Sequence, residues 1–318
     1  MHAIEVDHLS KHFGALVALN EISFTVAQGE TFGFLGPNGA GKTTTIRLLT
    51  GISPPTGGKA TIFGNDIVKA TTAARKTMGI VHETSNIYDD LSAWQNLMFS
   101  AELYTIGKKE REQRGKELLE LFGLYERRAD KVHGFSKGMK RRLTLAMGLI
   151  NNPRLLFLDE PTSGLDVQSN LIIRDVIRDL TSRGVTVFLT THNIEEANLT
   201  CDRVAIINKG SIAAIDSPER LKSTIQSVQS VEVAFSTVSA GREEDLRQLP
   251  GVSEVRKEGD KFRLYTRDPS VVIAVVMEYA QEQNTRVLSI NTVGPSLEDV
   301  FIKLTGLKVH TKGVSTVD

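Results

Sequence analysis

The stretch Gly36-Pro37-Asn38-Gly39-Ala40-Gly41-Lys42-Thr43 decides the fold of this chain. It fits G-x-x-x-x-G-K-[ST], the pattern of a phosphate-binding loop (P-loop), and it lies between an apolar strand over 31–35 and a helix over 44–49. Glycines let backbone N–H groups turn toward phosphate oxygens, and the start of the helix adds partial positive charge. A chance glycine turn is the alternative, but it does not account for the strand before the loop and the helix after it. The stretch therefore predicts a site for a nucleoside triphosphate.

Three side chains at the end of this loop have expected roles. Lys42 is expected to reach the β- and γ-phosphates, and the hydroxyl of Thr43 is expected to ligate Mg²⁺. Thr44, which opens the helix, is counted with the nucleotide-binding residues. ATP and Mg²⁺ are therefore the expected cofactors.

Composition excludes several classes of protein. The 318 residues are 40% hydrophobic and 24% charged with a net charge of zero, so no basic surface for nucleic acid is expected. The single cysteine, Cys201, excludes an internal disulfide and fits a reducing cytosol. The N-terminus has no signal-peptide pattern, and the longest apolar run, 271–277, is far shorter than the ~18 residues of a bilayer span. We expect a soluble chain whose membrane role, if any, comes through a partner.

Hydrophobic periodicity predicts an α/β domain over residues 1–220. Residues 1–30 alternate as half-buried antiparallel strands do, and a turn over 54–58 leads into a further strand over 59–63. Residues 92–149 instead have helical spacing. Short apolar runs at 155–158, 185–189 and 204–207 are typical of buried parallel strands. The expected fold is a P-loop core with an antiparallel β edge and an α-helical insertion.

A smaller α+β domain is expected to follow. A polar stretch over 221–230 is interpreted as a linker, 231–306 as the accessory domain and 307–318 as a flexible tail. The elements predicted in this domain are, in order, strand 231–235, helix 242–248, strand 252–257, strand 261–266, helix 270–282 and strand 286–291. This β-α-β-β-α-β order suggests a ferredoxin-like split, and Ser296 with Asp299 predicts a capping box at the start of a last helix.

Two further motifs carry candidate chemistry. In 155–162 a buried strand ends in Asp159 and Glu160; we expect Asp159 to hold Mg²⁺ and Glu160 to polarise the attacking water, with a solvated strand end as the alternative. In 135–140, Ser136 is a candidate N-cap and Gly138 permits close backbone approach at a helix start suited to an anion. A simple helix cap is the alternative there.

Together these residues resemble the ATP-binding subunit of an ATP-binding-cassette (ABC) transporter. Residues 36–43 match the family's Walker A motif, 155–160 its Walker B motif, 135–139 its signature, Ser163–Asp166 its D-loop and His192 its switch histidine. The resemblance covers about residues 1–220 and implies an ABC cassette with a RecA-like core. It further implies a head-to-tail dimer with a second copy of the chain or with a homologous cassette. Two ATP molecules lie at the interface of such a dimer, and Ser136 and Gly138 contact the ATP bound by the opposite subunit.

The resemblance also assigns single residues. Phe13 is similar to the aromatic that stacks on adenine, with a core aromatic as the alternative, and Asp166 joins the nucleotide-binding set. His192 is expected to hydrogen-bond the γ-phosphate and the attacking water, with a purely structural histidine as the alternative. A coupling surface is expected near the Glu83 loop and Trp94, although Trp94 is as readily a core residue.

Two motifs depart from the family pattern. The signature has Lys137 and Met139 where glycine and glutamine are usual; Lys137 either adds charge near the γ-phosphate or faces solvent. Glu83 stands where the Q-loop glutamine is expected, either as a carboxylate ligand near Mg²⁺ or as an exposed loop residue.

The segment 295–306 resembles the end of the C-terminal extension of exporter-type members, which pair with a separate permease. The expected function is thus an ATPase that powers export through an integral membrane partner, located in the cytoplasm against the inner face of the membrane. The alternatives are a soluble ABC ATPase acting on the ribosome or DNA, and a non-hydrolysing regulatory subunit. The cargo is not specified by these residues.

Overall fold

The computed structural model of the chain describes residues 1–84, 86–224, 229–237 and 241–306. The chain divides into two compact units, Met1–Pro218 and Glu219–Asp318. Within the described residues, no helix is both long enough and apolar enough to cross a bilayer. The P-loop lies in the first unit.

A six-stranded sheet in the order β10-β9-β3-β8-β7-β6 forms the centre of the first unit. Its strands are β3 (Thr31–Leu35), β6 (Met78–Val81), β7 (Leu155–Asp159), β8 (Thr186–Thr191), β9 (Arg203–Asn208) and β10 (Ser211–Asp216). All neighbours pair in parallel except β10, which is antiparallel to β9, so the prediction of buried parallel strands is confirmed. Because the carboxyl ends of parallel strands meet at one edge, β3, β7 and β8 deliver their following loops to the same place.

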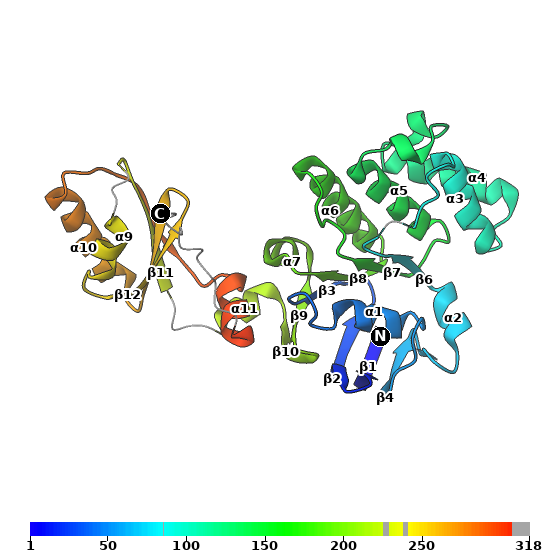
Figure 1. The fold of residues 1–318 in the computed structure, drawn as a ribbon, viewed down its shortest axis with the longest axis horizontal. Helices are drawn as coiled ribbons and strands as arrows, with labels where there is room; N and C mark the ends of the chain where they lie inside the picture. Colours follow the sequence, from blue (N-terminus) through cyan, green and yellow to red (C-terminus); the bar gives the residue numbers. More distant parts are fainter. Residues whose placement is uncertain (85, 225–228, 238–240, 307–318) are drawn as a thin grey trace, which may run out of the picture. The chain divides into compact units, whose positions relative to one another are not determined.

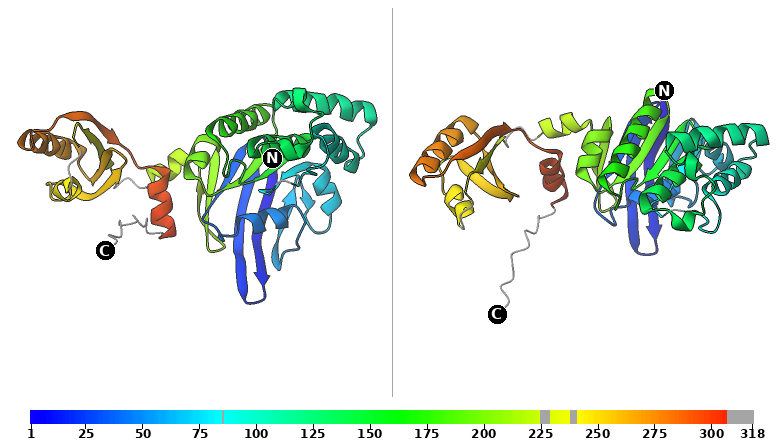
Figure 2. Two further views of the ribbon diagram at one scale, coloured as in Figure 1. Left: turned by 45° about the horizontal axis from the view of Figure 1, so that its top comes forward. Right: turned by 90° about the horizontal axis from the view of Figure 1, so that it is seen from above.

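A second, antiparallel sheet confirms the predicted β edge and has the order β2-β1-β4-β5. Its strands are β1 (His2–Phe13), β2 (Leu16–Ala27), β4 (Gly57–Ile62) and β5 (Asn65–Asp66); the 12-residue β1 and β2 run side by side in blue in Figure 2. Helix α1 (Lys42–Leu49) lies between the two sheets and contacts β2, β4, β7 and β8 (Figure 1).

Phenylalanine rings join the two sheets beneath the P-loop. Neighbouring ring centroids are 5.4 to 6.1 Å apart in a buried group made of Phe24, Phe32, Phe34, Phe157 and Phe188. Burying such rings stabilises a domain strongly through the apolar area removed from water. Strand β3, which leads into the P-loop, is therefore held by tightly packed rings.

Helices cover the face of the six-stranded sheet opposite α1 (Figure 1). The predicted helical insertion is confirmed and consists of α3 (Ala93–Leu103), α4 (Lys108–Leu121), two 3₁₀ turns (Tyr125–Arg127 and Val132–Gly134) and α5 (Lys137–Leu149). The other helices of this unit are α2 (Thr71–Lys76), α6 (Val167–Ser182) and α7 (Ile194–Thr200). Helix α5 packs on β6 and α6 on β8, so the insertion rests directly on the core sheet.

The second unit has the predicted β-α-β-β-α-β order. Its elements are β11 (Gln229–Phe235), α9 (Arg242–Arg247), β12 (Val252–Glu258), β13 (Lys261–Thr266), α10 (Pro269–Glu282), β14 (Val287–Val293) and α11 (Leu297–Thr305). The strands form an antiparallel sheet in the order β12-β13-β11-β14, which is the ferredoxin-like arrangement that was predicted. Helices α9 and α10 pack on this sheet over one apolar core.

The predicted capping box at the last helix is present. Ser296 and Asp299 each bond the other's backbone N–H at the start of α11. The carboxylate of Asp299 also accepts hydrogen bonds from Arg263 Nη2 (3.3 Å) and from the hydroxyl of Tyr265 (3.0 Å). The start of α11 is thereby fixed to strand β13.

The expected linker over 221–230 is corrected at both ends. Helix α8 (Pro218–Ser223) occupies its first residues and buries Leu221, and β11 begins at Gln229. Proline favours the first turn of a helix, and the polar composition of α8 concealed it from periodicity. Residues 225–228 and the predicted flexible tail over 307–318 lie outside the described residues.

Candidate functional site

The P-loop joins β3 to α1 in the predicted way. Gly41 has φ of 110°, in the left-handed region that favours glycine, and a Cβ built on Gly36 would lie 2.5 Å from the carbonyl oxygen of Ile207. No side chain caps the start of α1. The N–H groups at this helix start are therefore available to an anion.

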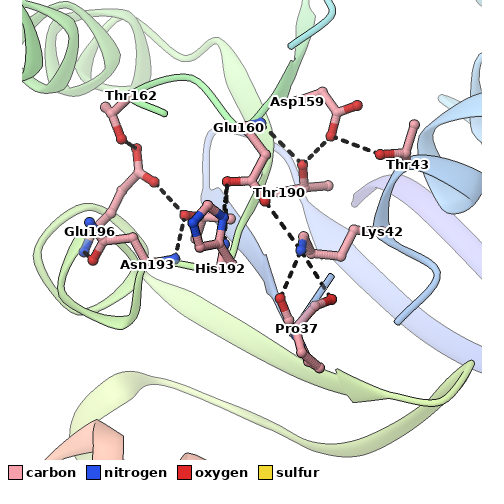
Figure 3. Close-up of polar contacts among 12 residues, drawn as sticks. Pro37, Lys42, Thr43, Asp159, Glu160, Thr162, Thr190, His192, Asn193 and Glu196 are labelled. Carbon is pink, nitrogen blue, oxygen red and sulfur yellow. Dashed lines mark hydrogen bonds and ion pairs between the residues drawn. The ribbon is translucent and has the colours of Figure 1, made fainter. Parts of the chain in front are cut away.

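Lys42 lies buried inside this loop (Figure 3). Its Nζ donates to the carbonyl oxygens of Gly36 at 2.7 Å and Pro37 at 3.3 Å, and it lies 3.2 Å from Glu160 Oε1. An ammonium held between backbone carbonyls and one carboxylate is directed into the loop. This position fits the predicted contact with phosphates.

Thr43 and Asp159 meet as the metal prediction requires. The hydroxyl of Thr43 donates to Asp159 Oδ1 at 3.4 Å, and the hydroxyl of Thr190, at the end of β8, donates to the same oxygen at 2.5 Å. Hydroxyl and carboxylate oxygens are the ligands that Mg²⁺ prefers. The two predicted residues are therefore chemically suited to such an ion.

Glu160 stands at the centre of the site in an unusual backbone conformation. Its φ is 47°, and its N–H donates to the carbonyl oxygen of Thr190 at 3.1 Å. Its carboxylate is 8% exposed and lies between Lys42 and His192, whose Nδ1 is 2.8 Å from Oε2. A non-glycine residue with positive φ costs free energy and is frequent at functional sites. The two predicted catalytic residues, Glu160 and His192, are thus in direct contact.

The signature segment opens α5 as predicted. Ser136 is the N-cap, and its Oγ accepts from the N–H of Met139 at 3.2 Å. Gly138 is buried, and a Cβ there would lie 2.3 Å from Ser169 Oγ on α6, so this glycine permits close packing of two helix starts. Within the described residues, neither Ser136 nor Gly138 forms a hydrogen bond with the P-loop.

Lys137 is exposed but does not extend freely into solvent. A Cβ built on Gly164 would lie 2.3 Å from Lys137 Nζ, which places the ammonium over the D-loop of its own chain. Asp166 ends that loop as the N-cap of α6, and its carboxylate accepts from the N–H and hydroxyl of Ser169 at 2.8 and 2.9 Å. These bonds lower the pKa of Asp166, the backbone one foremost. Its contact with nucleotide stays a prediction.

The ring of Phe13 is 52% exposed at the end of β1, so the alternative of a core aromatic is wrong. Lys11 Nζ lies 5.0 Å from the ring centroid. An exposed ring at a strand end is free to stack on a base, and adenine stacking stays a prediction.

The residues beside Glu83 and the side chain of Trp94 line different hollows. Glu83 is exposed in the bend after β6, as both of its interpretations allow, and its role as a metal ligand stays a prediction. Residues 82, 84 and 86 line a pocket of about 190 Å³ together with Leu103 and Tyr104, whereas the half-buried Trp94 lines a different hollow beside Tyr125. The expectation of one coupling groove that includes Trp94 is corrected, because the side chain of Trp94 packs toward Gly115 on α4.

Sequence patterns did not reveal the support behind His192. Glu196 is 5% exposed, and its carboxylate accepts from the hydroxyls of Thr162 at 2.7 Å and Thr191 at 2.5 Å. Burial raises the pKa of Glu196. The spacing of Asn193 and Glu196 is that of a helix start, which was the available signal. The network fixes the strand end that carries His192.

Comparison with known proteins agrees with this geometry. The family model described as ABC transporter matches residues 19–163, and the one described as ATP-binding protein DrrA1-3-like, C-terminal domain, matches residues 217–305. Linearmycin resistance ATP-binding protein LnrL of Bacillus subtilis (strain 168) is 35% identical over 95% of this chain and 98% of its own length. Nod factor export ATP-binding protein I of Rhizobium sp. (strain N33) is 38% identical over 97% of this chain and 98% of its own.

A solved structure is similar to the first unit. The ATP-binding cassette MJ0796, in a dimeric post-hydrolysis state bound to ADP and Pi, is 25% identical with a TM-score of 0.62 over 67% of this chain and 98% of its own. The similarity of whole chains together with the Walker A and Walker B geometry leaves one conclusion. The chain belongs to the ATP-binding proteins of the ABC transporter family, and it is an ATPase that binds and hydrolyses ATP.

Proposed function

We propose that two copies of this chain close head to tail on two ATP molecules and thereby power export through a separate membrane permease. This proposal rests on how the residues of the site are distributed in the chain. Lys42, Glu160 and His192 are linked in one chain, whereas Ser136 lies at an exposed helix start with only local bonds. A second copy that presents its own Ser136 and Gly138 completes the site. The dimeric state of the MJ0796 cassette supports the association of two cassettes.

Within each site, the chemistry of each side chain determines its role. Thr43 and Asp159 hold Mg²⁺, which neutralises phosphate charge when it is bound. Lys42 contacts the phosphates, and Glu160 orients and polarises the attacking water. His192, held against Glu160, hydrogen-bonds the γ-phosphate and the attacking water.

Three more residues complete the proposed nucleotide site. Phe13 stacks on adenine, and Asp166 shapes the D-loop beside the partner's nucleotide. Glu83 replaces a neutral amide near Mg²⁺ as an additional oxygen ligand. These assignments rest on sequence position and on the exposure of Phe13 and Glu83.

The membrane partner is proposed from the relatives and from one surface. The names of the two relatives refer to resistance and to export. The pocket that His82, Thr84 and Asn86 line also includes the exposed side chain of Tyr104. Tyr88 and Phe99, which lie two positions and one position along the chain from the lining residues Asn86 and Ser100, are exposed as well, and their ring centroids are 5.3 Å apart in edge-to-face contact. Exposed apolar groups beside a hollow mark protein contacts. We assign this surface to the permease, which would hold the chain on the cytoplasmic face of the membrane.

A mixing experiment tests the shared site. Lys42→Met removes the phosphate contact, and Ser136→Asp keeps a good N-cap while it sets a negative charge against the γ-phosphate of the opposite copy. Each variant alone is expected to be inactive. Co-expressed copies with different tags are expected to regain part of the wild-type ATP turnover, because a mixed dimer has one intact site.

The control for this mixing is each variant co-expressed with itself under the same tags. If each chain carried a complete site, mixing the two inactive variants would restore nothing. That result would refute the head-to-tail arrangement even if the dimer itself were detected by its mass.

The transport proposal has a separate test against the soluble alternative. The tagged chain is purified from detergent-solubilised membranes of its source cells, and the bound proteins are identified. Recovery of an integral membrane protein in constant ratio is expected. Recovery with ribosomes or DNA and without a membrane protein would overturn the transport role, although not the ATPase activity.

A further inference from the structure

Arg141 connects the helical insertion to two segments of the core. It projects from α5, is 4% exposed, and donates to five backbone carbonyl oxygens. These oxygens belong to the turn 159–161 after β7 and to the bend 82–83 after β6. One side chain therefore joins the catalytic turn, the loop of Glu83 and the helix of the signature.

The bonds to the catalytic turn use one edge of the guanidinium. Nε donates to the carbonyl oxygen of Pro161 at 2.9 Å, and Nη2 donates to those of Asp159 at 2.8 Å and Glu160 at 3.1 Å. Nη1 donates to the carbonyl oxygens of His82 and, at 3.4 Å, Glu83.

The guanidinium is thereby saturated with partners. It has five N–H donors, and five carbonyl oxygens accept from it. Burial lowers the pKa of Arg141, and nearby carboxylates, that of Asp159 foremost, act in the opposite direction. An arginine keeps its charge in proteins, so a cation that is costly to bury is held here in a fully bonded position. Such a position is specific for a planar, five-donor group, which lysine cannot replace.

The bond to Glu160 bears on the conformation of that residue. With φ of 47°, Glu160 is held on its N–H side by Thr190 and on its carbonyl side by Arg141. The direction of the carboxylate toward Lys42 and His192 depends on this backbone conformation. If Arg141 is lost, the turn can relax to an ordinary φ, which would rotate the carboxylate away.

We propose that Arg141 is a positioning residue for hydrolysis: it holds Glu160 in its left-handed backbone conformation and keeps the Glu83 loop in register with the catalytic turn. This role rests on the proposed function of Glu160 as the group that polarises water. Arg141 forms no bond with the P-loop among the described residues, so it acts on the rate of the chemical step and not on the affinity for ATP.

The test compares Arg141→Gln and Arg141→Lys with Arg142→Gln as the matched control. Arg142 is the next arginine of α5, but its Nη1 donates to the carbonyl oxygen of Phe122 at 2.9 Å, inside the helical insertion. ATP turnover of the purified full-length chain is measured over a range of Mg-ATP concentrations. Both Arg141 variants are expected to lower kcat by at least about 10-fold with KM changed less than about 2-fold, whereas Arg142→Gln leaves both near wild type.

Four results would overturn the positioning role. These are a kcat for Arg141→Gln equal to that of Arg142→Gln, a rise in KM as large as the fall in kcat, full rescue of kcat by lysine, and failure of both Arg141 variants to fold in thermal unfolding. The last result would make Arg141 a residue of general stability. Glu160→Gln is assayed alongside: if it keeps the wild-type rate, the function of Glu160 fails, whereas an inactive Glu160→Gln with a normal Arg141→Gln refutes only the role of Arg141.

Discussion

Glu160→Gln is expected to slow ATP hydrolysis by at least about 100-fold while ATP binding stays intact. Glutamine has the same shape and keeps an oxygen for His192, but an amide cannot take up a proton from water. The carboxylate of Glu160 is 8% exposed and contacts both Lys42 and His192, so the substitution removes the acidic group that these two residues hold in place. ATP turnover and equilibrium binding of Mg-ATP to the same preparation measure the two effects.

The matched control is Glu195→Gln, an exposed glutamate in the first turn of α7. It changes the net charge by the same amount but is not part of the site, so turnover near the wild-type rate is expected. Hydrolysis by Glu160→Gln at a rate close to wild type would show that the catalytic assignment is wrong. Loss of ATP binding in that variant would show that the carboxylate is needed to shape the P-loop.

Lys42→Met is expected to weaken ATP binding by about 100-fold and to abolish turnover at ordinary ATP concentrations. One hydrogen bond to a charged group contributes about 1.5–3 kcal/mol, or roughly 10- to 150-fold in affinity. Lys42 is expected to contact two phosphates, which favours the upper part of this range. Methionine keeps the apolar stem in its buried position and removes only the ammonium. Equilibrium titration with Mg-ATP measures the change.

Lys59→Ala is the control for the loss of one lysine charge. Its Nζ is exposed and lies 3.4 Å from Asp7 on the antiparallel sheet, away from the site. Wild-type affinity is expected for this variant. If Lys42→Met also binds ATP normally, the nucleotide is held by backbone N–H groups alone, and the role of Lys42 must be reassigned.

Local patterns predicted the parts of the molecule whose function depends on sequence neighbours. The P-loop needs a strand before it and a helix after it, so 36–43 could be placed at the edge of the sheet without a structure. Alternating apolar residues and turn signals also gave the element order of the second unit, and pairing antiparallel neighbours gave its ferredoxin-like sheet. In both cases the interactions that determine the structure join residues that are close in sequence, or they follow a regular repeat of apolar residues.

Long-range support of the site could not be predicted in this way. Arg141 bonds to residues 59 and 20 positions away, and backbone carbonyl acceptors leave no trace in the sequence. A signal existed: Gly138, Arg141 and Leu145 lie on one buried stripe of α5, where an arginine is unexpected. The assignment of Trp94 to a different hollow from the Glu83 loop was missed because helical spacing does not say which side of α3 packs on α4 and which on α5.

The acceptors of Arg141 have one consequence for how this protein can change over generations. A carbonyl oxygen is present whatever amino acid occupies the position, so substitutions at positions 82 and 83 leave these bonds available. At position 82 the bend after β6 can therefore exchange its side chain to suit a new neighbour while its backbone stays where the ATPase requires it. Mutational tolerance is expected to be high at His82 and low at Arg141, whereas Glu83 stays restricted by its proposed role near Mg²⁺. Because Arg141 binds the backbone of the bend after β6, a side chain on this surface can be substituted without moving the turn that carries Glu160.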